Sequence, residues 1–223
     1  MDILTIKEDI LASNRKEAQG IRTMLEQRGT YLVNLMASPG AGKTSTILQL
    51  ARTWGDGVSL GVIEGDIDSM VDSHKVKEAG IPAVQIDTGG ACHLDVPMVA
   101  PALELLDLDA LDVVIVENIG NLVCPAEFDI GADLAAMILS VPEGDDKILK
   151  YPLMFSICDV LIVNKTDFLA LPSNNFDVEL LRERMAHLNP DAAVFEVSAY
   201  TGEGFADLAA WMGQRMEEKR NGR

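Results

Sequence analysis

Short apolar runs alternate with amphipathic segments along most of the chain. Runs rich in Val, Ile and Leu are typical of strands that are buried on both faces of a sheet. Such runs occupy residues 31–37, 59–65, 83–86, 112–118, 135–141, 158–164 and 193–199. Apolar residues at helical spacing predict helices over residues 6–27, 43–53, 68–80, 97–106, 175–188 and 205–218.

The alternation of strands and helices favours a mostly parallel sheet with helices on both faces. We therefore predict an α/β fold in two parts, an N-terminal helix over residues 1–29 and a single domain over residues 30–223. In such sheets, ligands bind in the loops beyond the carboxyl ends of the strands. The polar and glycine-rich segments that follow the strands are therefore the candidate sites.

The composition argues against several classes of protein. The 223 residues carry a formal net charge of −17, which repels nucleic acid and anionic lipid, so we expect neither as a partner. No apolar run approaches the ~20 residues that cross a bilayer, and the charged N-terminus does not have the pattern of a secretion signal. We expect a cytoplasmic protein, in which three cysteines, an odd number, argue against a disulfide framework.

A phosphate-binding loop follows the first predicted strand and makes the domain a P-loop NTPase. The segment ASPGAGKT fits the G-x-x-x-x-G-K-[ST] pattern except at its first position, Ala37. Glycines let backbone N–H groups surround phosphates, and the next helix directs its positive end at the same anion. Lys43 is expected to bridge the β- and γ-phosphates, and the Thr44 hydroxyl to bind Mg²⁺. The predicted nucleotide-binding residues of this loop are Pro39, Gly40, Ala41, Gly42, Lys43, Thr44 and Ser45.

Two later segments favour guanine over adenine. The tetrad NKTD ends a predicted strand, and the Asp167 carboxylate can accept hydrogen bonds from guanine N1–H and N2–H₂, whereas adenine presents an acceptor there. Polar groups left unpaired reject the wrong base. The stem of Lys165 can lie along the purine, and backbone N–H groups after the last strand are expected to meet the base carbonyl. The sequence therefore predicts GTP/GDP, bound by Asn164, Lys165, Asp167, Ser198 and Ala199.

Two acidic residues compete for the magnesium ion. Glu117 ends the 112–118 strand beside Asn118, where a Walker-B carboxylate belongs, and Asp66 follows the second strand, where it can hold a metal-bound or attacking water. The alternative for both is a solvated carboxylate in a turn. We predict Thr44, Asp66 and Glu117 as magnesium ligands, and Lys43 and Asp66 as catalytic residues. No glutamine or arginine is evidently placed to activate water, so slow hydrolysis of GTP to GDP and phosphate is expected.

The segment GGACHLD places a cysteine and a histidine side by side. Cys92 and His93 follow the third strand and Cys124 follows the fourth, so both loops are expected at the same edge of the sheet as the phosphate loop. Neighbouring residues on a strand point to opposite faces, so Cys92 and His93 can share a metal only where the chain is irregular, which the two glycines permit. Two thiolates and an imidazole suit Zn²⁺ or Ni²⁺. Spacing alone nevertheless favours simple packing of the two cysteines, as we also expect for Cys158.

Together these motifs resemble the hydrogenase-maturation nickel-insertion GTPases, the HypB family of SIMIBI-class P-loop GTPases. The resemblance is carried by SPGAGKT, EGDIDS, the Cys-His pair, ENIGNLVCPAEFDIG, SVPEGDDK, KYPLMF and NKTD, in this order, and it covers nearly the whole chain from about Tyr31. It implies a metal site formed by Cys92, His93 and Cys124, which reverses the preference for packing.

The resemblance also implies partners. These are a second copy of the chain in a GTP-bound homodimer, a small zinc-containing nickel-delivery protein reached through the N-terminal region, and the precursor of the hydrogenase large subunit, which receives nickel. Residues 1–30 contain neither Cys nor His, so we expect no second nickel site there. A urease-maturation GTPase is the nearest alternative, although its Cys-Pro-His motif fits this sequence poorly. A nucleotide-dependent kinase with incidental cysteines and a metal-binding scaffold with a vestigial nucleotide site are further alternatives, which NKTD and the intact phosphate loop disfavour.

Overall fold

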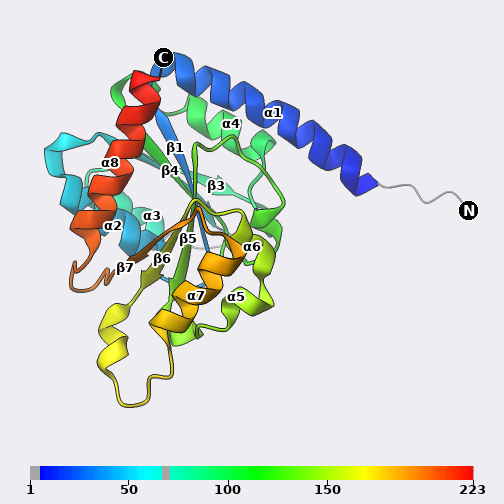
Figure 1. Ribbon diagram of the computed structural model, residues 1–223. Coiled ribbons are helices and arrows are strands. Elements are labelled where there is room, and N and C mark those ends of the chain that lie inside the picture. Colours follow the sequence, from blue (N-terminus) through cyan, green and yellow to red (C-terminus); the bar gives the residue numbers. More distant parts are fainter. Residues whose placement is uncertain (1–5, 67–70, 223) are drawn as a thin grey trace, which may run out of the picture.

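The computed structural model describes residues 6–66 and 71–222, with side chains described for residues 12–65 and 75–222. A seven-stranded sheet forms its centre, in the order β3-β2-β4-β1-β5-β6-β7 (Figure 1). The strands are β1 (Tyr31–Ala37), β2 (Leu60–Asp66), β3 (Ala83–Asp87), β4 (Val113–Glu117), β5 (Leu134–Ser140), β6 (Val160–Asn164) and β7 (Ala193–Glu196). All neighbouring strands are parallel, which confirms the predicted α/β fold.

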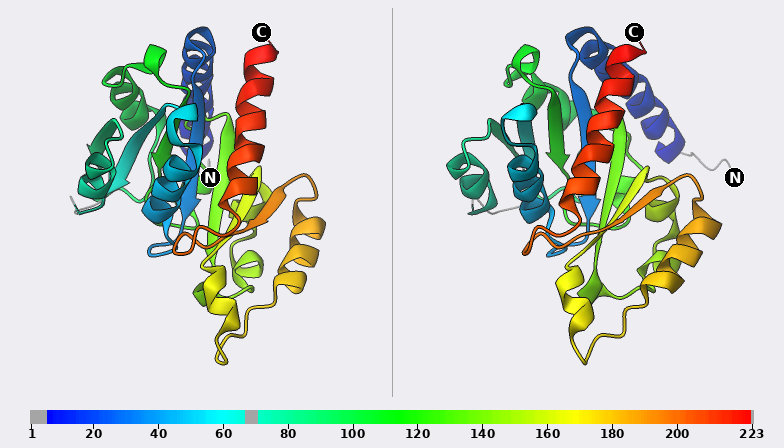
Figure 2. Two further views of the ribbon diagram at one scale, coloured as in Figure 1. Left: turned by 90° about the vertical axis from the view of Figure 1, so that its left-hand side faces the viewer. Right: turned by 60° about the vertical axis from the view of Figure 1, so that its left-hand side comes forward.

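Helices cover both faces of the sheet, as the two views of Figure 2 show. One face carries α2 (Lys43–Trp54), α3 (Val71–Glu78) and α8 (Phe205–Asn221). The other face carries α1 (Ile6–Arg28), α4 (Val96–Glu104), α5 (Lys147–Lys150), α6 (Pro152–Ser156) and α7 (Val178–Leu188). Short 3₁₀ helices lie at Gly55–Gly57, Leu108–Ala110, Cys124–Ala126, Val141–Glu143 and Thr166–Ala170. The first half of α1 extends beyond the rest of the domain (Figure 1).

The central strand β1 shows why the apolar runs form strands. All of its residues are buried, because α2 and α8 cover one face and further helices cover the other. Val33 and Leu35 belong to the first layer, whereas Leu32 and Met36 belong to the opposite layers. Each large apolar side chain buried in this way contributes about 1.5–3 kcal/mol to stability. Because both faces of the strand are buried, a continuous run of apolar residues is favoured over alternation of apolar and polar residues.

The predicted helices and strands are confirmed, with ends that differ by a few residues. The run over residues 193–199 stops being a strand at Glu196, because the chain then enters a loop in which the Ser198 N–H donates to the Glu203 carbonyl at 3.0 Å. The helix predicted over residues 68–80 is observed as α3, and residues 67–70 lie outside the described residues. The short α5 and α6 were not predicted, because neither is long enough to show a helical period.

The parallel sheet gathers the predicted motifs at one edge. All seven strands run in the same direction, so the loops that follow their carboxyl ends lie on the same side of the molecule. The phosphate loop, both acidic positions, both cysteine-bearing loops, NKTD and the loop after β7 all follow strands in this way. Within the described residues, none of the helices combines the length and hydropathy that a membrane span requires.

Candidate functional site

The phosphate loop joins β1 to α2 and is shaped by two glycines. Gly40 and Gly42 have φ angles of 75° and 101°, a left-handed region that favours glycine. Helix α2 then begins at Lys43, so its first backbone N–H groups point into the loop. A helix N-terminus preceded by such a loop is a ready site for phosphate.

The NKTD tetrad lies directly against this loop. The Asn164 side chain donates to the Ala41 carbonyl at 3.0 Å, and a Cβ on Gly42 would lie only 2.5 Å from Asn164 Nδ2. Lys165 reaches the same loop, because its Nζ donates to the Gly40 carbonyl at 2.7 Å. The tetrad and the phosphate loop therefore form one site, as the sequence predicts.

A cavity of about 450 Å³ opens beside these residues. Its lining comes from the phosphate loop, NKTD and the loop after β7, and comprises Gly42, Ser45, Asn164, Lys165, Asp167, Phe168, Ala199 and Tyr200. The Asp167 carboxylate is held by the Ser198 hydroxyl, which donates to Asp167 Oδ1 at 2.6 Å. The cavity thus offers one oriented carboxylate next to flat apolar side chains, an arrangement suited to a base with paired N–H donors.

The loop after β7 differs from the sequence expectation in its backbone donors. The Ser198 N–H donates to the Glu203 carbonyl of the same loop, and the Ala199 N–H donates to Asn164 Oδ1 at 3.1 Å. Asn164 Oδ1 also accepts from the Lys165 N–H at 2.8 Å. Because the Asn164 side chain bonds both Ala199 and Ala41, it connects the loop after β7 to the phosphate loop. Ser198 acts here through its hydroxyl, a role that the sequence alone did not predict.

One of the two acidic positions, Glu117, lies beside the start of α2. The Thr44 hydroxyl donates to Glu117 Oε1 at 3.0 Å, so a hydroxyl and a carboxylate meet beside the phosphate loop. These are oxygen donors of the kind that Mg²⁺ takes from proteins, and the pair therefore fits the predicted ion. Asp66 is the last residue of β2 and lies in register with Asp87 of β3, but its side chain is outside the described residues.

A further carboxylate holds the phosphate loop from the β5 side. Glu143 accepts hydrogen bonds from the Ser140 N–H at 2.8 Å and from the Ser140 hydroxyl at 2.6 Å, and it also accepts a hydrogen bond from the hydroxyl of Ser38 in the phosphate loop. No sequence motif marks Glu143, because its bond with Ser38 joins residues far apart in the sequence.

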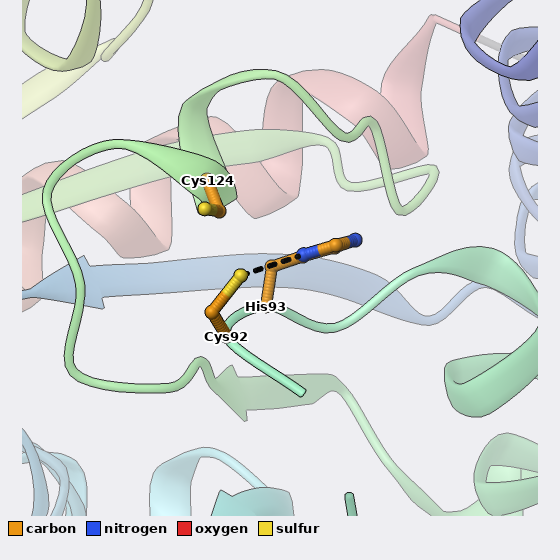
Figure 3. A group of neighbouring side chains, drawn as sticks. All are labelled: Cys92, His93 and Cys124. Carbon is orange, nitrogen blue, oxygen red and sulfur yellow. Dashed lines mark hydrogen bonds between the residues drawn. The ribbon is translucent and has the colours of Figure 1, made fainter. Parts of the chain in front are cut away.

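Cys92, His93 and Cys124 converge at the same edge of the sheet (Figure 3). One ligand atom from each lies within 4.8 Å of the others, and Cys92 Sγ is 3.6 Å from His93 Nδ1. The chain before them is irregular, with φ angles of 58° at Gly89 and 90° at Gly90. Cys92 and His93 can share a metal only if the chain is irregular there, as argued above from the sequence. The three side chains can hold one metal ion without moving far.

The surroundings of the cluster orient its donors. The His93 ring stacks on Phe128 with a centroid separation of 3.7 Å, and burial lowers its pKa against the opposing influence of Asp95 and Glu127. A neutral imidazole is the form that binds a metal. The hydrogen bond with Cys124 raises the pKa of Cys92. The two cysteine side chains are therefore hydrogen-bonded to each other when no metal is bound.

The remaining cysteine behaves as predicted. Cys158 is buried within the hydrophobic layer beneath α6 and α7, and its thiol donates to the Phe155 carbonyl at 3.3 Å. Burial raises its pKa to about 12, so it stays protonated and is a poor ligand at neutral pH. Of the other two histidines, His187 is exposed on α7, and the side chain of His74 lies outside the described residues.

Comparison with known proteins identifies the family of the chain. Residues 31–196 match the family described as "CobW/HypB/UreG, nucleotide-binding domain". The hydrogenase maturation factor HypB of Azotobacter vinelandii is 44% identical over 210 residues, which span 94% of this chain and 69% of the relative. The chain belongs to the HypB family. The resemblance inferred from the motifs is thereby confirmed.

Solved structures place the chain in the same family. A crystal structure of HypB from Helicobacter pylori in complex with nickel is 37% identical, with a TM-score of 0.87 over 94% of this chain and 96% of that one. A structure of the 54 kDa signal recognition particle protein from Aeropyrum pernix matches with a TM-score of 0.56 at 16% identity, over 86% of this chain and 48% of that one, and so supports only the fold. The HypB-family domain is therefore a nucleotide-binding domain of the P-loop GTPase fold.

Proposed function

We propose that this HypB-family chain is a GTP-hydrolysing nickel carrier and switch that assists nickel insertion into the precursor of a [NiFe]-hydrogenase large subunit. One observation carries the proposal. The Thr44–Glu117 pair and Cys124 are joined by a single loop, and Cys92 and His93 meet Cys124 from the other side. A nucleotide site and a soft-donor metal site are thus close enough for one to alter the other.

The nucleotide chemistry is assigned to the phosphate loop and its neighbours. Lys43 and the N–H groups at the start of α2 bind the phosphates, and Asp167 selects guanine. Thr44, Glu117 and Asp66 hold Mg²⁺, which would supply charge neutralisation at the β- and γ-phosphates. Asp66 orients the attacking water. Neither residues 37–44 nor residues 117–124 contain a glutamine or an arginine, so we expect slow intrinsic turnover.

The metal chemistry is assigned to Cys92, His93 and Cys124. Two sulfurs and an imidazole suit Ni²⁺ and also Zn²⁺, and three protein ligands leave a position open for a partner's ligand during transfer. Nickel is the cargo in this proposal. The nickel-bound relative from Helicobacter pylori, which covers almost the same length of chain, supports this choice.

The proposed partners follow from the family and from the open metal position. A second copy of the chain joins in the GTP-bound state, so that the metal sites of two copies meet at one interface. A small zinc-containing protein delivers nickel through the N-terminal region, and α1, part of which extends beyond the domain (Figure 1), offers accessible surface for it. The hydrogenase precursor receives the metal, and these steps take place in the cytoplasm.

Nickel titration in two nucleotide states tests the proposal. Calorimetry of the full chain with Mg²⁺-GDP and with a non-hydrolysable GTP analogue is expected to give different nickel affinities, because a ligand shifts an equilibrium only through its differential affinity. Cys92→Ala and Cys124→Ala are expected to lose most of the affinity, whereas Cys158→Ala, which alters a buried cysteine outside the cluster, retains it. Equal affinities in both states would contradict the switch, and intact binding in both ligand variants would contradict the metal site.

A further inference from the structure

Asn121 lies at the junction of the two loops that carry the metal ligands. Its side-chain amide donates to the Cys92 carbonyl at 3.1 Å, and its side-chain oxygen accepts from the Val123 N–H at 2.9 Å. The first bond reaches the loop after β3, and the second fixes the residue immediately before Cys124. One side chain therefore sets the distance between the two cysteine-bearing segments.

The backbone of the same residue is bound to the phosphate loop. The Asn121 N–H donates to the Ala37 carbonyl at 3.0 Å, and Ala37 is the residue at which β1 ends and the phosphate loop begins. The preceding residue packs just as closely, since a Cβ on Gly120 would lie 2.9 Å from the N, Cα and Cγ of Pro39. Residues 120 and 121 are therefore in direct contact with the phosphate loop.

A second asparagine holds the assembly in place from inside the core. Asn118 is fully buried; its oxygen accepts from the N–H groups of Leu94 and Ile119, at 3.2 and 2.9 Å, and its amide donates to Asn34 Oδ1 at 3.0 Å. Because Asn34 lies on β1 and Leu94 follows His93, this network fixes the base of both loops. Asn121, which is half-buried, links the same two loops nearer the surface.

We propose that Asn121 is a positioning residue that sets the separation of Cys92 and Cys124 and passes movements of the phosphate loop to the metal site. The inference rests on the proposed function, because it describes how nucleotide state reaches the nickel ligands. Asn121 is not among the residues assigned here to the nucleotide or to the metal. It acts through the Cys92 carbonyl, the Val123 N–H and the Ala37 carbonyl.

The test replaces Asn121 by serine in the full chain. The serine hydroxyl retains a short local acceptor for the Val123 N–H but cannot span the distance to the Cys92 carbonyl. The matched control is Asn174→Ser, because Asn174 makes the same local turn, accepting from the Phe176 N–H at 3.1 Å, away from the cysteines. Asn121→Ala, which removes both side-chain bonds, gives a second and stronger perturbation.

Three readouts distinguish positioning from a general loss of structure. Outer residues that orient metal ligands are worth about 10–100-fold in affinity, so we expect Asn121→Ser to weaken Ni²⁺ binding about tenfold and Asn121→Ala somewhat more. The thiolate-to-metal charge-transfer band, measured with Ni²⁺ and with Co²⁺, is expected to shift. The ratio of nickel affinities between the GDP and GTP-analogue states is expected to fall toward one, while GDP affinity remains that of the unmodified chain.

The outcomes separate this inference from the proposed function. If Asn121→Ser matches Asn174→Ser in nickel affinity, spectrum and affinity ratio while Cys92→Ala loses nickel, the positioning role is wrong and the metal site stands. If Cys92→Ala also retains nickel, the proposed function itself fails. A loss of GDP affinity as large as the loss of nickel affinity in Asn121→Ser would also overturn the assignment. The hydrogen bond that this substitution removes, to the Cys92 carbonyl, does not reach the phosphate loop.

Discussion

Gly120 offers the sharpest test of the contact between the cysteine-bearing loop and the phosphate loop. Gly120 does not have a left-handed backbone, so alanine is disfavoured at this position only because its Cβ lacks space. The added Cβ would lie 2.9 Å from three atoms of Pro39, two of them backbone atoms. To reach the 3.4–4 Å of ordinary contact, one of the two loops must move by about 0.5–1 Å.

The magnitude of this perturbation follows from the packing. Forcing an extra carbon into a filled space costs about 1–3 kcal/mol, and each kcal/mol shifts the Tm of a chain of this size by ~2–4 °C. Gly120→Ala is therefore expected to lower the Tm by about 2–12 °C. A displacement approaching 1 Å at a catalytic loop costs on the order of 100-fold in rate, so GTP turnover is expected to fall about 10–100-fold.

Differential scanning fluorimetry with and without Mg²⁺-GDP, together with phosphate release, measures both effects. The matched control is Gly213→Ala in α8, where a Cβ would meet no atom within 4 Å. Alanine is the better helix former by about 0.5–1 kcal/mol, so this variant is expected to raise the Tm by about 1–4 °C. An unchanged Tm and unchanged turnover in Gly120→Ala, beside the expected gain in Gly213→Ala, would refute the transmission of movement between the loops.

Two further predictions address base selection and acid stability. Asp167→Asn exchanges an acceptor for a donor opposite the guanine amino group, so GTP is expected to bind about 10²–10⁴-fold more weakly and XTP, with a carbonyl at that position, more tightly; competition binding of the two nucleotides measures this. At Asp112, burial acts to raise the pKa, but hydrogen bonds from Ser59 and Arg220 outweigh it and lower the pKa below 3.8. The stability from this carboxylate is therefore present above pH 3.8 and lost as pH falls through the lowered value, so urea unfolding of Asp112→Asn is expected to show a smaller loss of stability in that acid range.

The sheet was predictable because its signal is local. The inner strands β1, β4, β5 and β6 are runs of mostly buried residues, whereas the edge strands β3 and β7 are half-buried. Strand β1 matches the predicted residues 31–37 at both ends. The phosphate loop and NKTD are contiguous motifs whose residues lie at fixed offsets. Their mutual contact followed once the strands were known to be parallel, because β1 and β6 then direct both motifs to the same edge.

The parts that sequence reasoning missed are contacts between distant segments. Ser198 holding Asp167, Glu143 accepting from Ser38, and Phe128 stacking on His93 each join residues whose side chains have several possible partners. No periodicity reports such a pair. The left-handed φ of 61° at Lys165 was equally hidden, although it directs this lysine back to the phosphate loop.

The convergence of the metal ligands also depends on Gly65, a glycine of the EGDIDS motif whose packing role could not be inferred from the motif alone. In the sheet, β2 separates β3 from β4, so the loop after β3 must cross the end of β2 before Cys92 can meet Cys124. Leu94 makes this crossing possible by packing onto Gly65, where a Cβ would lie 2.7 Å from Leu94 Cδ1. Leu94 is fully buried there, and its N–H is held by Asn118. A side chain at residue 65 would lift the loop and draw His93 away from the cluster. The adjacency of the metal and nucleotide sites therefore requires an empty position on the strand between them, as well as the cysteines themselves.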